Sequence, residues 1–156
     1  MKKKYKFPSK YIPKVLSGKD KKKQMKMLMK SKNMYKKGKY YTRKKLPSYK
    51  SKRSRHLSNA SKIYKIKNIS PNKQLSKKTG CSIIGMKKII RKGEGAYYSA
   101  GSRPNQSPQS WALARLASSL TGGKASIVDY KILEKYCNHN KKAFILAKSA
   151  KLRKSK

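Results

Sequence analysis

Lysine and arginine supply 45 of the 156 residues and aspartate and glutamate only four, so the formal charge is +41. Mutual repulsion of this size works against a compact state of the isolated chain. The apolar fraction of 36% is also below the roughly 45–50% of ordinary globular domains. The composition therefore excludes a large apolar core. It indicates a partner with negative charge: nucleic acid, an anionic membrane or an acidic protein surface.

Charge and proline positions divide the chain into three expected parts. Residues 1–17 predict an extended basic arm, because two prolines disfavour a helix there. Residues 18–137 are expected to form a helical domain, of which the region 93–133 is nearly neutral. Residues 138–156 are expected to form a basic C-terminal helix or tail.

The first helix is expected from Ser17 to Lys37. Ser17 fits an N-terminal capping pattern, and Gly38 fits the position just after the helix. One face is expected to be apolar, while lysines fill the rest of the surface. The residues of that face are Met25, Leu28, Met29 and Tyr35.

The segment after this helix predicts loop and short elements. Residues 40–51 predict a loop, and a short helix is expected through Leu57 and Ala60. Residues 63–66 predict a short strand-like run. The remaining elements are helical, so the fold class is expected to be mainly α.

A pair of helices is predicted on either side of Gly80. The first begins at Ser70-Pro71, and the second is capped by Ser82 and stops at Gly93. The apolar, small and glycine positions from Leu75 to Ile89 resemble a helix-turn-helix unit. Two interpretations stay open: the second helix contacts DNA phosphates, or the pair is a packing unit. Base readout is not expected, because no arginine, asparagine or glutamine stands at the helix start.

The nearly neutral region predicts a loop followed by helices. Residues 93–107 are expected to be an ordered loop packed on the core. Ser107 is expected to cap a helix from Pro108 to Thr121, and further helices are expected over about 126–136 and from near Asn140. The residues expected to face inward are Leu113, Leu116, Ala117, Leu120, Val128, Ile132, Leu133, Tyr136, Phe144 and Ala147.

No catalytic, cofactor or metal site is predicted. The four carboxylates are scattered and form no acid–base pair. Residues 121–126 lack the earlier glycine and the hydroxyl residue of a phosphate-binding loop. Cys81 and Cys137 are expected to be free thiols, and with the two histidines they match no zinc spacing. The Gly93-Glu94-Gly95 segment is weak evidence for an anion-binding nest. We therefore expect a protein that is not an enzyme and takes no cofactor or small-molecule substrate.

Lysine runs interleaved with tyrosines are the main binding signal. Basic side chains attract phosphates by releasing counterions, and tyrosine rings can stack on exposed bases. The runs include Lys2–Lys4 and Lys52-Arg53. The interleaved tyrosines are Tyr5, Tyr35, Tyr40, Tyr41 and Tyr49. The candidate residues for binding nucleic acid or another polyanion are Lys21, Lys22, Lys23, Lys36, Lys37, Arg43, Lys44, Lys45, Lys87, Lys88 and Arg91.

Several motifs resemble one known family over roughly residues 8–137. They are GAYYSAGSRPNQS over residues 95–107, SW over 110–111, ARLAS over 114–118, TGGKA over 121–125, KKGKYYTRK over 36–44 and TGCS over 79–82. They are similar to a small basic domain of unknown function encoded by large nucleocytoplasmic DNA viruses of algae and amoebae. The resemblance implies a viral origin and assigns no catalytic residues.

Two roles follow from composition and resemblance together. The first is a non-enzymatic virion structural protein, a minor capsid component whose lysine-rich arms lie on acidic capsid proteins. Arg103 and Arg115 would then hold the shape of the core or a partner. The alternative is a sequence-independent protein that binds and condenses viral DNA. A third, weaker possibility is the surface of an inner membrane. We expect the protein in the virion, and in the host cell during assembly.

Overall fold

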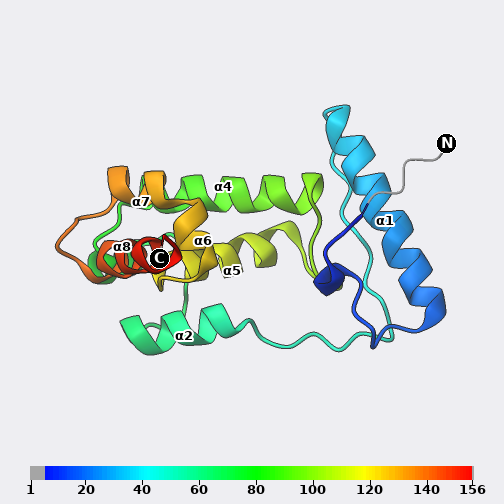
Figure 1. Cartoon of the computed structure of the whole chain (residues 1–156), viewed down its shortest axis with the longest axis horizontal. Coiled ribbons are helices and arrows are strands. Elements are labelled where there is room, and N and C mark those ends of the chain that lie inside the picture. The colour runs from blue at the N-terminus through cyan, green and yellow to red at the C-terminus, as the bar shows by residue number, and fades with distance from the viewer. Residues whose placement is uncertain (1–5, 156) are drawn as a thin grey trace. The chain divides into compact units, whose positions relative to one another are not determined.

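The computed structural model describes residues 6–155, and this part of the chain is mainly α-helical, as predicted (Figure 1). The helices are separated by turns and loops, and the described residues contain no named strand. Lys2–Lys4 and Tyr5, which the sequence assigns to the basic arm, lie outside the described residues. The elements are η1 (Ser9–Tyr11), α1 (Gly18–Lys36), α2 (Arg55–Tyr64), α3 (Lys73–Thr79), α4 (Ile83–Ser99), α5 (Pro108–Leu120), α6 (Lys124–Val128), α7 (Tyr130–Tyr136) and α8 (Lys142–Lys154).

The chain forms two compact units, each built from two separate segments. Unit 1 comprises Met1–Lys52 and Glu94–Trp111, and unit 2 comprises Arg53–Gly93 and Ala112–Lys156. Helices α4 and α5 each contribute residues to both units. The sequence instead suggested boundaries near residues 17 and 137, because charge runs are visible along a chain and tertiary contacts are not.

Helix α1 has the ends that the sequence predicts. The backbone N–H of Asp20 donates to Oγ of Ser17 at 3.2 Å, and Gly38 follows the helix in the left-handed region with φ 75°. The buried face differs in part from the prediction. Its residues are Asp20, Gln24, Met27, Leu28 and Ser31. Of the predicted face only Leu28 is buried, because hydrogen bonds let polar side chains share the interior.

The described part of the predicted arm packs within unit 1. Tyr11 and Leu16 are buried, and the carbonyl of Tyr11 accepts a 3.0 Å hydrogen bond from Nε2 of Gln24. The ring of Tyr11 meets Trp111 edge-on, with 5.9 Å between centroids. Residues 9–11 form a 3-10 turn, so this part of the chain is not simply extended.

Helix α2 confirms the short helix through Leu57 and Ala60, but the expected strand-like run is wrong. Tyr64 is the last residue of α2, and Lys65 takes the left-handed conformation with φ 53°. Tyr64 and Ile66 are both buried in the unit 2 core, and the Tyr64 hydroxyl donates to the Leu120 carbonyl. These apolar residues therefore anchor the end of α2 and the turn after it in the core, and they do not belong to a sheet.

Helix α4 runs through Gly93, where the sequence predicted a stop, and continues to Ser99. The glycine has a packing role: a Cβ built there would lie 2.7 Å from Cα of Ala112 on α5. Gly93 thus allows two helices to approach closely. The predicted loop over residues 93–107 begins only after Ser99, and Gly93 to Gly95 are helical, so the suggested anion nest does not form.

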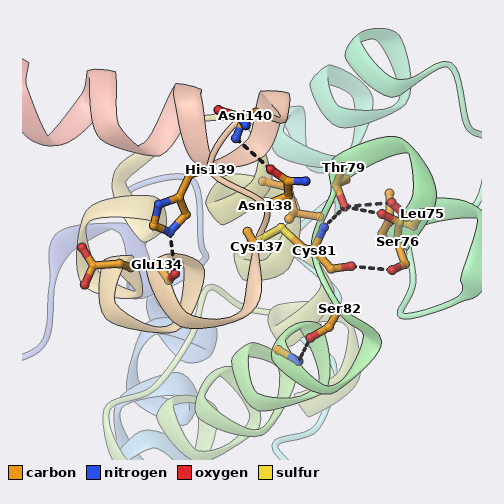
Figure 2. The surroundings of a disulfide bond; sticks show 12 residues. Leu75, Ser76, Thr79, Cys81, Ser82, Glu134, Cys137, Asn138, His139 and Asn140 are labelled. Atoms are coloured by element: carbon orange, nitrogen blue, oxygen red, sulfur yellow. Dashed lines mark hydrogen bonds between the residues drawn. A yellow bond between two sulfur atoms is a disulfide. The ribbon is translucent and has the colours of Figure 1, made fainter.

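A disulfide joins Cys81 to Cys137, so the prediction of free thiols is wrong (Figure 2). The two cysteines also form an isolated antiparallel bridge. Its neighbours strengthen the junction: the N–H of Ser82 donates to the Tyr136 carbonyl at 2.9 Å, and the N–H of Asn138 donates to the Gly80 carbonyl at 2.8 Å. The cysteines are 56 residues apart in the chain, so only the fold brings them together.

The last three helices pack on one another in unit 2 (Figure 1). The predicted helix over 126–136 is divided at Asp129 into α6 and α7. Leu133 is buried as expected, whereas Val128 is 67% exposed and does not face the core. Helix α8 buries Phe144 and Ala147, as predicted. Asp129, at the junction of the two helices, has its side chain buried and hydrogen-bonded to Arg115.

Candidate polyanion-binding surface

Two of the four carboxylate side chains, Asp20 and Asp129, are buried. Asp20 accepts hydrogen bonds from the backbone N–H of Ser48 at 3.1 Å and from its hydroxyl, and these bonds hold the pKa of Asp20 below its ordinary value. Asp129 is 1% exposed. Glu94 is half-buried, which leaves Glu134 as the exposed acidic side chain of the described residues. The surface is therefore almost purely cationic.

Arg115 carries the network that holds Asp129. Its Nε donates to Oδ2 at 3.0 Å and its Nη2 donates to Oδ1 at 2.7 Å. The hydroxyl of Ser119 donates to Oδ2 at 3.0 Å, and Nζ of Lys92 lies 3.6 Å from Oδ1. A buried carboxylate requires such partners, since an unpaired charge away from water is costly. Arg115 thus holds the core, one of the two roles the sequence allowed for it.

The outer side of α1 is a lysine ridge. The 19-residue helix contains eight lysines, and at about 1.5 Å per residue it is about 28 Å long. Five of the eight lie exposed along one side from Lys19 to Lys30, so their charges recur about every 4 Å along the helix, against ~3.4 Å per phosphate along one strand of B-DNA. These five, which we call the α1 lysine ridge, are Lys19, Lys22, Lys23, Lys26 and Lys30.

The predicted binding residues of unit 1 are partly or fully exposed, with one exception, and Lys22 and Lys23 belong to this ridge. Lys21 is half-buried on α1, and the others are exposed at the end of α1 and in the loop after it. These exposed residues are Lys36, Lys37, Lys44 and Lys45. Lys22, Lys23 and Lys36 were selected from runs of lysine, and their exposure reflects the strong hydration of the ammonium group.

Arg43 is the exception, and its assignment to the binding surface is wrong. It is 8% exposed. Its Nη1 donates to Oγ of Ser31 and to the Tyr97 carbonyl, both at 2.9 Å, and its Nη2 donates to Oγ of Ser102 at 2.8 Å. Burial lowers the pKa of Arg43. A planar guanidinium has donors for several acceptors at once, so this arginine crosslinks unit 1 instead of meeting a ligand.

Lys87, Lys88 and Arg91 lie together on the exposed face of α4, beside Ile84, which is 64% exposed. In the turn before α4, Gly80 is left-handed with φ 80°, as the predicted helix-turn-helix pattern requires of its glycine. The preceding helix is capped by Asn72, whose Oδ1 accepts from the N–H of Leu75 at 2.8 Å, and not by the predicted Ser70-Pro71.

The first turn of α4 is covered on one side by α7. A Cβ built at Gly85 would lie 2.4 Å from Cβ of Tyr136, so the glycine permits this contact. The disulfide ties the preceding residue Cys81 to the end of α7 (Figure 2). These contacts favour the packing interpretation of the helix pair. Lys87, Lys88 and Arg91 of α4 remain exposed.

Residues 6–155 define a small, mainly helical and strongly cationic protein with two compact units. Within this range no helix has the length and apolar character needed to cross a membrane, and no three His, Cys, Asp or Glu side chains gather to hold a metal ion. The chain belongs to the family of unknown function DUF5824, whose model matches residues 8–144. Comparison with curated proteins and with solved structures found no match.

Proposed function

We propose that the protein is a non-enzymatic, sequence-independent nucleic-acid-binding protein. The observation that carries this proposal is the α1 lysine ridge, whose charges recur about every 4 Å along the helix, comparable with the ~3.4 Å between phosphates along a strand. Lysine suits contacts without sequence preference, because its ammonium group is a point charge on a flexible stem. The cations on α4 would add phosphate contacts from unit 2.

The burial of the carboxylates supports the same conclusion. Asp20 and Asp129 are buried among donors, so they do not interrupt the cationic surface. Neutralising a phosphate releases condensed counterions, and this release makes the binding free energy of a cationic surface on nucleic acid more favourable. An acidic protein surface seldom carries one charge every few ångströms along a line, and it therefore matches the ridge less well.

A minor capsid role, with acidic capsid proteins as neighbours, is the second candidate. The sequence feature that favours it is an extended basic arm, of the kind that a protein threaded between larger subunits needs. Residues 6–17 instead contribute Tyr11 and Leu16 to the interior of unit 1, which weakens that support. We therefore place nucleic acid first. The viral setting, implied by the motifs, is part of the proposal for both roles.

Salt-dependent binding to a 20-base-pair DNA duplex tests the proposal. We expect the logarithm of the association constant to fall linearly with the logarithm of salt concentration, by about 0.9 for each phosphate neutralised. Fluorescence anisotropy measures this slope at salt concentrations from about 50 to 200 mM, a range over which proteins that contact many phosphates lose much of their affinity. Two duplexes of unrelated sequence should give the same affinity.

Matched variants separate a ridge from net charge alone. Replacing Lys22, Lys23 and Lys26 of α1 by glutamine should reduce the slope by about 2–3, one phosphate contact for each lysine. The control replaces three exposed cations of α8, and removes the same charge. These control positions are Lys142, Lys148 and Arg153. Equal losses from the two variants would mean that the ridge has no dedicated role.

A third variant and a competitor address the remaining alternatives. Replacing Lys87, Lys88 and Arg91 by glutamine should weaken binding more than the α8 control if α4 contacts DNA, and equally if α4 only packs. Polyglutamate of equal charge serves as a mimic of an acidic protein. If it displaces the duplex as well as unlabelled duplex does, the surface does not distinguish nucleic acid from an acidic protein, and the preference for nucleic acid is rejected.

A further inference from the structure

Three tyrosines from two distant parts of the sequence gather in unit 1. The rings of Tyr35 and Tyr98 are stacked, with 6.3 Å between centroids and 8° between planes. Tyr40 lies 5.0 Å from Tyr98 and 6.2 Å from Tyr35. We call these three residues the tyrosine cluster. The sequence placed Tyr35 and Tyr40 among lysines but assigned Tyr98 to a loop of the core.

Local structure explains why the rings meet. Gly38 is left-handed, its N–H donates to the Tyr35 carbonyl at 3.0 Å, and the N–H of Lys39 donates to the Met34 carbonyl at 2.9 Å. This reversal after α1 returns the chain toward the helix, so Tyr40 lies beside Tyr35. Tyr98 joins them because α4 extends beyond Gly93 to Ser99.

The cluster remains open to solvent, unlike the buried tyrosines of the chain. Tyr40 is 69% exposed and Tyr35 is 37% exposed, whereas Tyr97, next to Tyr98, is completely buried. Adjacent apolar ring surfaces left in water mark an interaction site more often than isolated ones do. Exposed Lys37 and Lys39 belong to the same turn. Aromatic faces and cations thus occur together at the end of the α1 lysine ridge.

We propose that the tyrosine cluster is a stacking platform for unpaired bases of single-stranded nucleic acid, an inference that rests on the proposed function and names its substrate class. Phosphates of the strand contact Lys37, Lys39 and the ridge, while bases stack on Tyr40 and Tyr35. Every base has a π face, so stacking needs no sequence preference. A duplex keeps its bases stacked inside, and an acidic peptide lacks the planar rings, so both fit this surface less well.

The test compares nucleic acids of equal length with and without unpaired bases. The probes are a 20-nucleotide oligo(dT), an abasic DNA strand of the same length, a 20-nucleotide oligo(rU) and the 20-base-pair duplex. Base–aromatic stacking contributes about 1–3 kcal/mol per base, so we expect oligo(dT) and oligo(rU) to bind at least about fivefold more tightly than the abasic strand. Equal affinity for oligo(dT) and the abasic strand would overturn the platform.

Variants locate the effect at the cluster. Tyr35→Ala with Tyr40→Ala should bring oligo(dT) to the affinity of the abasic strand while leaving the abasic affinity and its salt slope unchanged. Tyr40→Leu, at the most exposed position, should lose part of the preference with no loss of fold, and Tyr40→Phe should keep it. A preference that survives in the alanine and leucine variants, checked as folded by circular dichroism, overturns the assignment to these residues.

The same measurements separate the two proposals. Salt-dependent binding of all probes without a preference for bases removes the platform and leaves nucleic-acid binding in place. Absence of binding to every probe at physiological salt removes both. A preference for the duplex over oligo(dT) in the wild-type protein contradicts the platform alone.

Discussion

The guanidinium of Arg43 lies over the ring of Tyr97, with 3.8 Å between Cζ and the ring centroid. The two residues are 54 positions apart and are joined twice more: the backbone N–H of Arg43 donates to the Tyr97 hydroxyl at 2.9 Å, and Nη1 of Arg43 donates to the Tyr97 carbonyl. The pair connects the two sequence segments of unit 1. An arginine inside so cationic a chain is therefore a structural crosslink.

Arg43→Lys should destabilise the protein although it preserves the charge. A lysine ammonium cannot stack flat on Tyr97 or reach the acceptors in the same fork geometry. Hydrogen bonds to charged groups contribute about 1.5–3 kcal/mol each, so we expect the free energy of unfolding to fall by about 2 kcal/mol or more. Urea unfolding followed by circular dichroism measures this difference.

The control for this substitution is Arg53→Lys, at an exposed position. It should leave the unfolding free energy within about 0.5 kcal/mol of wild type, as surface substitutions usually do. If both lysine variants were equally stable, Arg43 would not have the role assigned to it.

Removal of the disulfide should lower stability. The bond closes a loop between cysteines 56 residues apart, and closing such a loop restricts the unfolded chain. Replacing Cys81 and Cys137 by serine should lower the free energy of unfolding by about 2–4 kcal/mol. A reducing agent should lower the stability of the wild-type protein by a similar amount and have no effect on the double variant.

Thiol labelling checks the pairing itself. The purified wild-type protein, unfolded without reductant, should take up no maleimide at either cysteine. Two labelled thiols under those conditions would contradict the disulfide, and the stability difference between wild type and double variant would then need another cause.

Gly93→Ala should destabilise unit 2 even though alanine favours helices more than glycine. The added Cβ would lie 2.7 Å from Cα of Ala112, and backbone atoms cannot move aside as a flexible side chain can. Overpacking costs about 1–3 kcal/mol and the gain in helix propensity offsets about 1 kcal/mol, so we expect a net loss of up to about 2 kcal/mol. Thermal and urea unfolding give the value.

Gly18→Ala is the matched control for this substitution. A Cβ at Gly18, the first residue of α1, meets nothing within 4 Å. The variant should be as stable as wild type or more stable by up to about 1 kcal/mol, because alanine restricts the unfolded chain. A stable Gly93→Ala protein would show that α4 and α5 do not cross closely at that residue.

The sequence alone determined the features that depend on local chemistry. The mainly helical class, the bounds of α1 and the start of α5 follow from capping residues and apolar spacing; the N–H of Ser110 donates to Oγ of Ser107 at 3.0 Å, as a cap requires. Most of the candidate binding lysines are exposed, since a charged amine is stable in water and costly inside.

Tertiary structure decided what depends on residues distant in the chain. The sequence pattern predicts that Gly93 ends a helix, whereas in the structure Gly93 lets α5 pack closely against α4. The sequence likewise predicts free thiols, whereas the end of α7 brings Cys137 to Cys81 and the two form a disulfide. Arg43 is a surface cation by composition and a buried crosslink by its contacts with Tyr97. Local patterns record the preferences of a residue for its neighbours in sequence, whereas close packing, pairing and burial depend on which segments meet in space.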